Sequence, residues 1–127
     1  MPNLPAKPRI PPRDRFAGTE RVINLDQAFA ELPAESIVRQ GHIQKTLHRS
    51  GPTTTAIFCF DTGSALNQHV LQGEAVLHVL EGLLRVTTDA STNELGPNDL
   101  MLLEPGVPHD LKALKTTKVL LTVVLQG

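Results

Sequence analysis

Residues 69–82 read HVLQGEAVLHVLEG, with apolar side chains at almost every second position. Because successive side chains of a strand point to opposite faces, this alternation predicts a β-strand with one face in the core. The stretch also carries two histidines, His69 and His78, and two glutamates, Glu74 and Glu81. Imidazole and carboxylate groups are common metal ligands. The stretch therefore predicts a β fold and raises the question of whether these groups can meet around one ion.

The same two-residue period recurs on both sides of this stretch, with turn signals every eight to twelve residues. The connections are too short for crossover helices, so we expect mainly antiparallel sheets. About eight short strands in 127 residues predict a closed or sandwich-like all-β domain. The predicted strands are Ser36–Arg39, Ile43–His48, Thr54–Asp61, Ala75–Leu80, Leu83–Thr88, Asp99–Leu103, His109–Ala113 and Lys118–Leu125.

One stretch looks helical: NLDQAFAEL, residues 24–32, with Asn24 or Asp26 available as N-cap and Pro33 closing it. Before it, five of the ten prolines fall in the first twelve positions, among basic residues. We therefore expect residues 1–20 to form a flexible, extended arm and residues 21–127 to form a single domain.

Composition excludes several classes of partner. The formal charge is −1, from 12 basic and 13 acidic residues, so no net field attracts nucleic acid or a membrane surface. No stretch approaches the roughly 18–20 apolar residues of a membrane span. The single cysteine, Cys59, excludes an internal disulfide and fits a reducing compartment, so we expect a cytoplasmic protein.

Two spaced motifs resemble those of the cupin family. The series Gly63, His69, Leu71, Ala75 and Gly82 follows the spacing G-x5-H-x-H-x3-4-E-x6-G of the first cupin motif. The series Asn98, Glu104, Gly106, His109 and Ala113 follows the second, G-x5-P-x-G-x2-H-x3-N. Fifteen residues separate the two motifs, as in small bacterial cupins. The resemblance covers roughly residues 40–125 and implies a double-stranded β-helix, the small jelly-roll barrel, which is usually a homodimer.

The resemblance also implies a metal site, but in degenerate form. The family's metal usually takes three histidines and one glutamate, and only His69 and His109 match those positions, because Leu71 and Ala75 stand at the other two. His48, on an earlier strand whose face it shares with His42, could supply a third imidazole. Two imidazoles alone would hold a divalent ion such as Fe, Mn, Ni or Zn only weakly.

Without a metal, the same two histidines become polar anchors in an apolar pocket. By strand parity we expect its lining to include Leu71, Ala75, Leu77, Met101, Leu103 and Leu111. The preferred ligand would be a small organic molecule with an apolar body and a carboxylate, enol or carbonyl that reaches the imidazoles.

Three functions remain open. The first is a small-molecule-binding barrel of unproven activity, the second a metal-dependent dioxygenase or isomerase, and the third a dimeric scaffold or sensor without catalysis. The cupin-like sugar epimerases are excluded as a model because they use a tyrosine acid and this chain has no tyrosine. The apolar C-terminal stretch KVLLTVVLQG, residues 118–127, would aggregate as an exposed edge, so we expect either the partner sheet or a second subunit to cover it. The second of these covers would make the protein a homodimer.

Overall fold

The computed structural model describes residues 20–32 and 41–126 of the chain. The predicted strand Ser36–Arg39 and residues 1–19 of the predicted arm lie outside these ranges. Within the described residues, no helix is long and apolar enough to cross a membrane.

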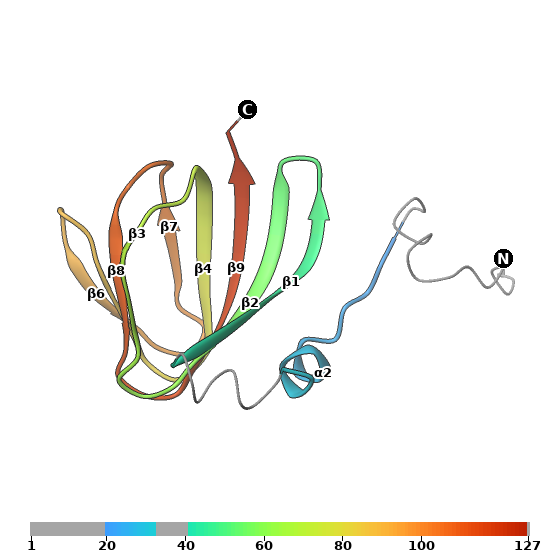
Figure 1. Cartoon of the computed structure of the whole chain (residues 1–127), viewed down its shortest axis with the longest axis horizontal. Helices are drawn as coiled ribbons and strands as arrows, with labels where there is room; N and C mark the ends of the chain where they lie inside the picture. The colour runs from blue at the N-terminus through green and yellow to red at the C-terminus, as the bar shows by residue number, and fades with distance from the viewer. Residues whose placement is uncertain (1–19, 33–40, 127) are drawn as a thin grey trace, which may run out of the picture.

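Two antiparallel sheets face each other and form the barrel (Figure 1). The five-stranded sheet has the order β1-β2-β9-β4-β7, with bounds His42–Ser50, Thr53–Phe60, Thr117–Leu125, Gly73–Glu81 and Leu100–Leu103. The four-stranded sheet has the order β3-β8-β5-β6, with bounds Ala65–His69, His109–Ala113, Leu84–Thr87 and Thr92–Leu95. This arrangement confirms the predicted all-β jelly roll.

Two strands were not predicted from the sequence. Strand β6, TNEL, lies at the edge of its sheet, and only Leu95 among its residues is buried. Strand β3, ALNQH, has no buried residue and an irregular register against β8. Both lack the apolar alternation that marks a half-buried strand. Their pairing partners, rather than their own propensities, hold them in the sheet.

The inward faces of both sheets supply one core. Along β4, Ala75, Leu77 and Val79 are buried while the intervening residues are partly exposed, which is the alternation read from the opening stretch. They belong to one core cluster with Leu84 and Val86, which lie on β5 of the opposite sheet and are both fully buried. Each such side chain stabilises the fold by about 1.5–3 kcal/mol relative to an exposed one.

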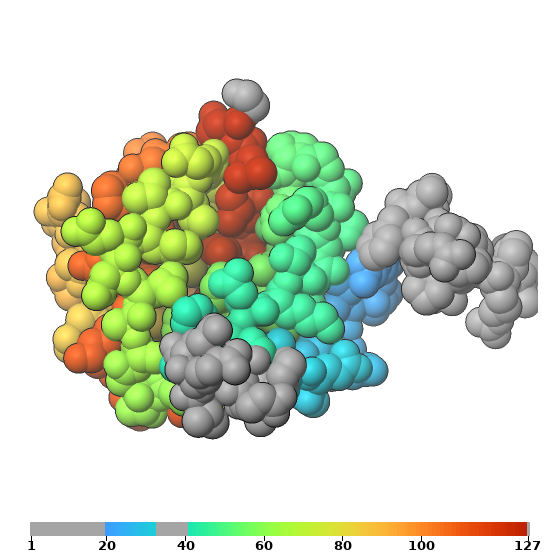
Figure 2. All heavy atoms as spheres, in the orientation of Figure 1, coloured from blue at the N-terminus to red at the C-terminus, as the bar shows by residue number. Residues whose placement is uncertain are grey.

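The short helix α2, Leu25–Ala30, covers part of the outer face of the five-stranded sheet (Figures 1 and 2). Asn24 is its N-cap, because its side-chain oxygen accepts a hydrogen bond of 2.9 Å from the backbone N–H of Gln27. Phe29 and Ala28 pack against Ile57 of β2 in a second, smaller cluster. The helix prediction is therefore confirmed, with Asn24 rather than Asp26 as the cap.

Candidate functional site

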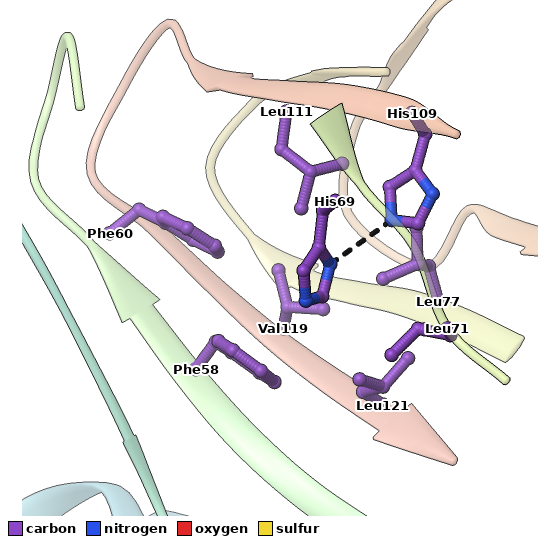
Figure 3. A pocket seen from close by; sticks show the side chains of 9 residues that line it. All are labelled: Phe58, Phe60, His69, Leu71, Leu77, His109, Leu111, Val119 and Leu121. Atoms are coloured by element: carbon purple, nitrogen blue, oxygen red, sulfur yellow. Dashed lines mark hydrogen bonds between the residues drawn. The ribbon is translucent and has the colours of Figure 1, made fainter. Parts of the chain in front are cut away.

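The barrel contains a small hollow with one polar side. Its lining combines two histidines with seven apolar residues from β2, β4, β8, β9 and the segment after β3: Phe58, Phe60, His69, Leu71, Leu77, His109, Leu111, Val119 and Leu121 (Figure 3). The hollow measures about 280 Å³ with the open space at its mouth included, and water centres can occupy about 10 Å³ of it. That inner space corresponds to about one water molecule.

The lining residues that are partly exposed include His69 at the end of β3 and Leu71 just after it. Strands β1 and β3 are edge strands of different sheets. Figure 2 shows atoms of β9 (red) between the yellow-green atoms of β3 and β4 and the green atoms of β1 and β2. Consistent with an opening, His69 and Leu71 are only partly buried, whereas His109 is 3% exposed. The hollow is therefore closed at the His109 side and accessible beside His69.

A bulge in β3 turns His69 into the barrel. Leu66 pairs with Leu111, but His69 pairs with His109, so β3 has one residue more than β8 between these pairs. In a regular strand, Gln68 would share the inward face of Leu66, and His69 would point outward. The extra residue reverses this parity. The bulge includes Gln68, whose φ of 52° is unusual for a residue with a side chain.

Asp110 stabilises that bulge from the neighbouring strand. Its Oδ1 accepts a hydrogen bond of 2.6 Å from the backbone N–H of Gln68. Asp110 follows His109 in β8 and is exposed, so it points away from the hollow, as strand parity predicts. It does not contact the hollow, but it holds the backbone turn that directs His69 toward His109.

The two histidine rings are in direct contact. Nδ1 of His69 lies 3.2 Å from Nε2 of His109, and the rings meet edge to face with centroids 5.1 Å apart and an interplanar angle of 80°. On its other side, Nδ1 of His109 lies 3.1 Å from the carbonyl oxygen of Val107. In Figure 3, Phe58 and Phe60 lie on one side of His69 and His109 lies on the other. The two imidazoles that the sequence singled out are thus neighbours within the barrel.

Burial lowers the pKa of His69 below its ordinary value, because the charged imidazolium is poorly solvated there. Electrostatic repulsion from His109 and then from His42 lowers the pKa of His69 further. His69 is therefore held in its neutral form near pH 7.

The prediction that His42 and His48 share one face of their strand is wrong. The register of β1 against β2 shifts between Thr46 and His48. His42 pairs with Phe60, whose ring centroid lies 5.6 Å from that of His42, so His42 faces the barrel interior. After the shift, His48 pairs with Thr55 on the opposite face. The structure thus does not bring His48, the suggested third ligand, to the histidine pair.

The predicted pocket residues divide into two groups. Leu71, Leu77 and Leu111 line the hollow together with the two histidines. Ala75 and Leu103 are buried in the same core cluster, and Met101 packs against it, but none of these three lines the hollow.

Sequence reasoning missed the lining residues on β2 and β9: Phe58, Phe60, Val119 and Leu121. The signal for them was present, because the two residues of each strand are two positions apart in an apolar run and so share a face. The two phenylalanine rings stack at 5.9 Å with an interplanar angle of 7°.

The donor set does not fit the family's metal. Among residues 20–32 and 41–126, no group of three or more histidine, cysteine, aspartate or glutamate residues could hold an ion. Glu74 is exposed on the outer face, and His78 lies within 3.3 Å of Asn98 there. Stable mononuclear sites generally need three protein ligands, so the histidine pair is incomplete as a metal centre.

Cys59 offers no alternative chemistry. It is buried in β2 as a free thiol, and its burial raises the pKa of the thiol above the ordinary value. A neutral, buried thiol is a poor nucleophile, since the thiolate is the reactive species.

Comparison with known proteins identifies the family. The family model of the cupin domain matches residues 56–125, more than half of the sequence, so the chain belongs to the cupin family. No curated protein matches the sequence significantly. The fold is similar to that of a conserved protein of unknown function from Streptococcus pyogenes, with 26% identity and a TM-score of 0.64, covering 70% of this chain and 78% of that one.

Two further solved structures share the fold at lower identity. One is a protein of unknown function from Rhizobium leguminosarum, with 20% identity and a TM-score of 0.70, covering 85% of this chain and 99% of that one. The other is a salicylate 1,2-dioxygenase mutant from Pseudoaminobacter salicylatoxidans, with 16% identity and a TM-score of 0.67. That match covers 79% of this chain but 32% of the dioxygenase. Identities this low indicate a common fold and not a common activity.

Proposed function

We propose that this cupin binds a small, partly apolar organic molecule at the mouth of its barrel, with His69 and His109 as polar anchors. The observation that carries the proposal is the histidine pair, which forms the polar side of an otherwise apolar hollow. A concave apolar surface with a few convergent polar groups is the usual form of a small-molecule site.

The dimensions restrict the ligand to one small ring or a short chain. The enclosed space of the hollow, about 10 Å³, is far smaller than ordinary ligand pockets, which are roughly 300–1,000 Å³. Its inner part holds about one water, so a ligand would enter from the mouth and displace Leu71, which is only partly buried.

The test is an NMR titration with single-ring and short-chain molecules, both neutral and anionic, added up to millimolar concentration. We expect shift changes confined to the lining residues, and loss of binding in His69→Ala. His78→Ala is the matched control, because this histidine lies on the outer face of the sheet near Asn98. If no molecule of the panel binds, the proposal fails, and the barrel is better regarded as a scaffold or sensor without a ligand.

A metal-dependent enzyme of the dioxygenase or isomerase type is the second candidate. The separation of 3.2 Å between the two ring nitrogens would also suit two ligands of one ion, because nitrogens bound to zinc at about 2.0–2.1 Å lie roughly 3.0–3.4 Å apart. With two protein ligands, Fe, Mn, Ni or Zn would be held weakly. Chelator treatment followed by metal titration, comparing the wild type with His109→Ala, tests this candidate. Absence of stoichiometric binding at micromolar metal would reject it.

We also propose a cytoplasmic homodimer. Leu100 and Leu102 of the edge strand β7 are 59% and 73% exposed on the outer face of the five-stranded sheet. They lie beside Val76 of β4, outside the part of this face that α2 covers. A second copy would bury this apolar face. Sedimentation should show a dimer that Leu102→Asp converts to a monomer. Val22→Asp, at a residue that is 94% exposed outside the sheet, should leave the dimer intact.

A further inference from the structure

The histidine pair has a fixed hydrogen-bond direction, which starts at Val107. A carbonyl oxygen can only accept a hydrogen bond, so the proton between Val107 and His109 belongs to Nδ1 of His109. In a neutral imidazole only one nitrogen carries a proton, so Nε2 of His109 is an acceptor. The proton of the contact between the rings therefore belongs to Nδ1 of His69, which donates to His109.

The same rule determines the role of the fourth ring nitrogen of the pair, Nε2 of His69. Because Nδ1 of His69 carries the proton, Nε2 of His69 has a free lone pair and can only accept. Among the described residues, Nε2 of His69 makes no hydrogen bond. In Figure 3 this nitrogen points away from His109, on the side of Phe58. The accessible polar atom of the hollow is thus an acceptor surrounded by apolar side chains.

An anionic ligand would require a different protonation state of the histidine pair. A carboxylate accepts hydrogen bonds, so it could be bound only if His69 first took up a proton on Nε2. Among the residues that the structure describes, no lysine or arginine lines the hollow to bind an anion in place of the imidazolium.

We propose that the hollow selects ligands by a hydroxyl group that donates a hydrogen bond to Nε2 of His69, such as a small phenol, an enol or a cyclic alcohol. The inference rests on the proposed small-molecule function and narrows its ligand class. The apolar ring of the ligand lies against Phe58, Leu71 and Leu121, and its hydroxyl donates to the ring nitrogen of His69 that makes no hydrogen bond within the described residues.

The first test needs neither ligand nor variant. Two-bond ¹H–¹⁵N spectra of the imidazole rings at pH 7.5 report which nitrogen of each histidine carries the proton. We expect the Nδ1–H form for both His69 and His109, which is the less common neutral tautomer of free histidine. Assignment uses single histidine-to-glutamine variants at all five histidines. An Nε2–H form of His69 would overturn the proposal whatever the ligand.

The second test compares phenol, benzene and benzoate, which share one ring and differ in the polar group. At pH 7.5 we expect phenol to bind the wild type roughly fivefold to tenfold more tightly than benzene, as one neutral hydrogen bond provides. In His69→Phe this preference should disappear, whereas His78→Phe should retain it.

The outcomes separate the two proposals. Benzoate binding more tightly than phenol, or phenol binding no better than benzene, overturns the acceptor assignment and leaves small-molecule binding in place. Binding of none of the three overturns both proposals. Stoichiometric zinc binding that His69→Phe abolishes would also overturn the acceptor assignment, because Nδ1 of His69 would then coordinate metal in place of donating to His109.

Discussion

Replacing Asp110 by alanine should displace His69 without touching the hollow. The wild-type carboxylate accepts a hydrogen bond of 2.6 Å from the backbone N–H of Gln68, inside the β3 bulge. A hydrogen bond to a charged group contributes about 1.5–3 kcal/mol, and the exposure of Asp110 places this one at the lower end. Gln68 has a φ of 52°, a conformation that costs a residue with a side chain roughly 1 kcal/mol. The hydrogen bond therefore just outweighs the cost of the bulge.

Without this hydrogen bond, we expect the unfolding free energy of Asp110→Ala, measured in urea, to fall by about 1–2 kcal/mol. We also expect the contact between His69 and His109 to weaken. Asp110→Asn, which retains an oxygen acceptor, should lose less than half of that. Adding Gln68→Gly to Asp110→Ala should recover most of the loss, because glycine adopts a positive φ freely. Glu74→Ala, at an exposed carboxylate of β4, is the control and should change little. An Asp110→Ala protein with wild-type stability and unchanged His69 resonances would refute the reasoning.

The remaining predictions concern pH, packing and the second interior histidine. The folded-state pKa of His69 is below the ordinary 6.5, so the unfolded chain binds more protons below that pH. The unfolding free energy should therefore fall as pH drops below about 6.5 and stay level above it, and His69→Gln should reduce that fall in urea titrations at several pH values. Gly73→Ala should cost about 2–3 kcal/mol or prevent folding, because the new methyl group would overlap the backbone of Val124, whereas Gly96→Ala meets only ordinary contacts. His42→Ala should raise the pKa of His69 measured by NMR, and His48→Ala, on the other face of β1, should not; equal effects of the two changes would contradict the register of β1.

Much of the architecture followed from local patterns. The alternation in residues 69–82 predicted β4 and its inward face, and Asn24 before an apolar run predicted the cap of α2. The six other predicted strands that fall in described residues also correspond to observed strands. These features depend on side-chain periodicity and on hydrogen bonds within a few residues, and both are visible in the sequence.

The site was only partly visible. The motif spacing selected His69 and His109, which meet at 3.2 Å, but it did not show that a hydrogen-bonded pair results. Glu74 precedes the inward-facing Ala75, so side-chain alternation predicts that Glu74 points outward, and it is exposed. Side-chain alternation predicted the wrong face for His48, because the alternation holds only in a strand without bulges and β1 contains a bulge. The phenylalanines of β2 lie outside both motifs, so the motif spacing did not select them.

By itself, then, the sequence determined the all-β class, the inward rows of β4 and the identity of the two histidines. Only the tertiary structure decided that His69 faces the barrel, that His42 rather than His48 lies on the same side, and that the hollow is small. The physical reason is that one extra residue in a strand reverses every side chain after it. Whether a bulge forms depends on the partner strand, here on Asp110 opposite Gln68, which is distant in the chain. The volume of the hollow likewise depends on how side chains from both sheets fill the space between them.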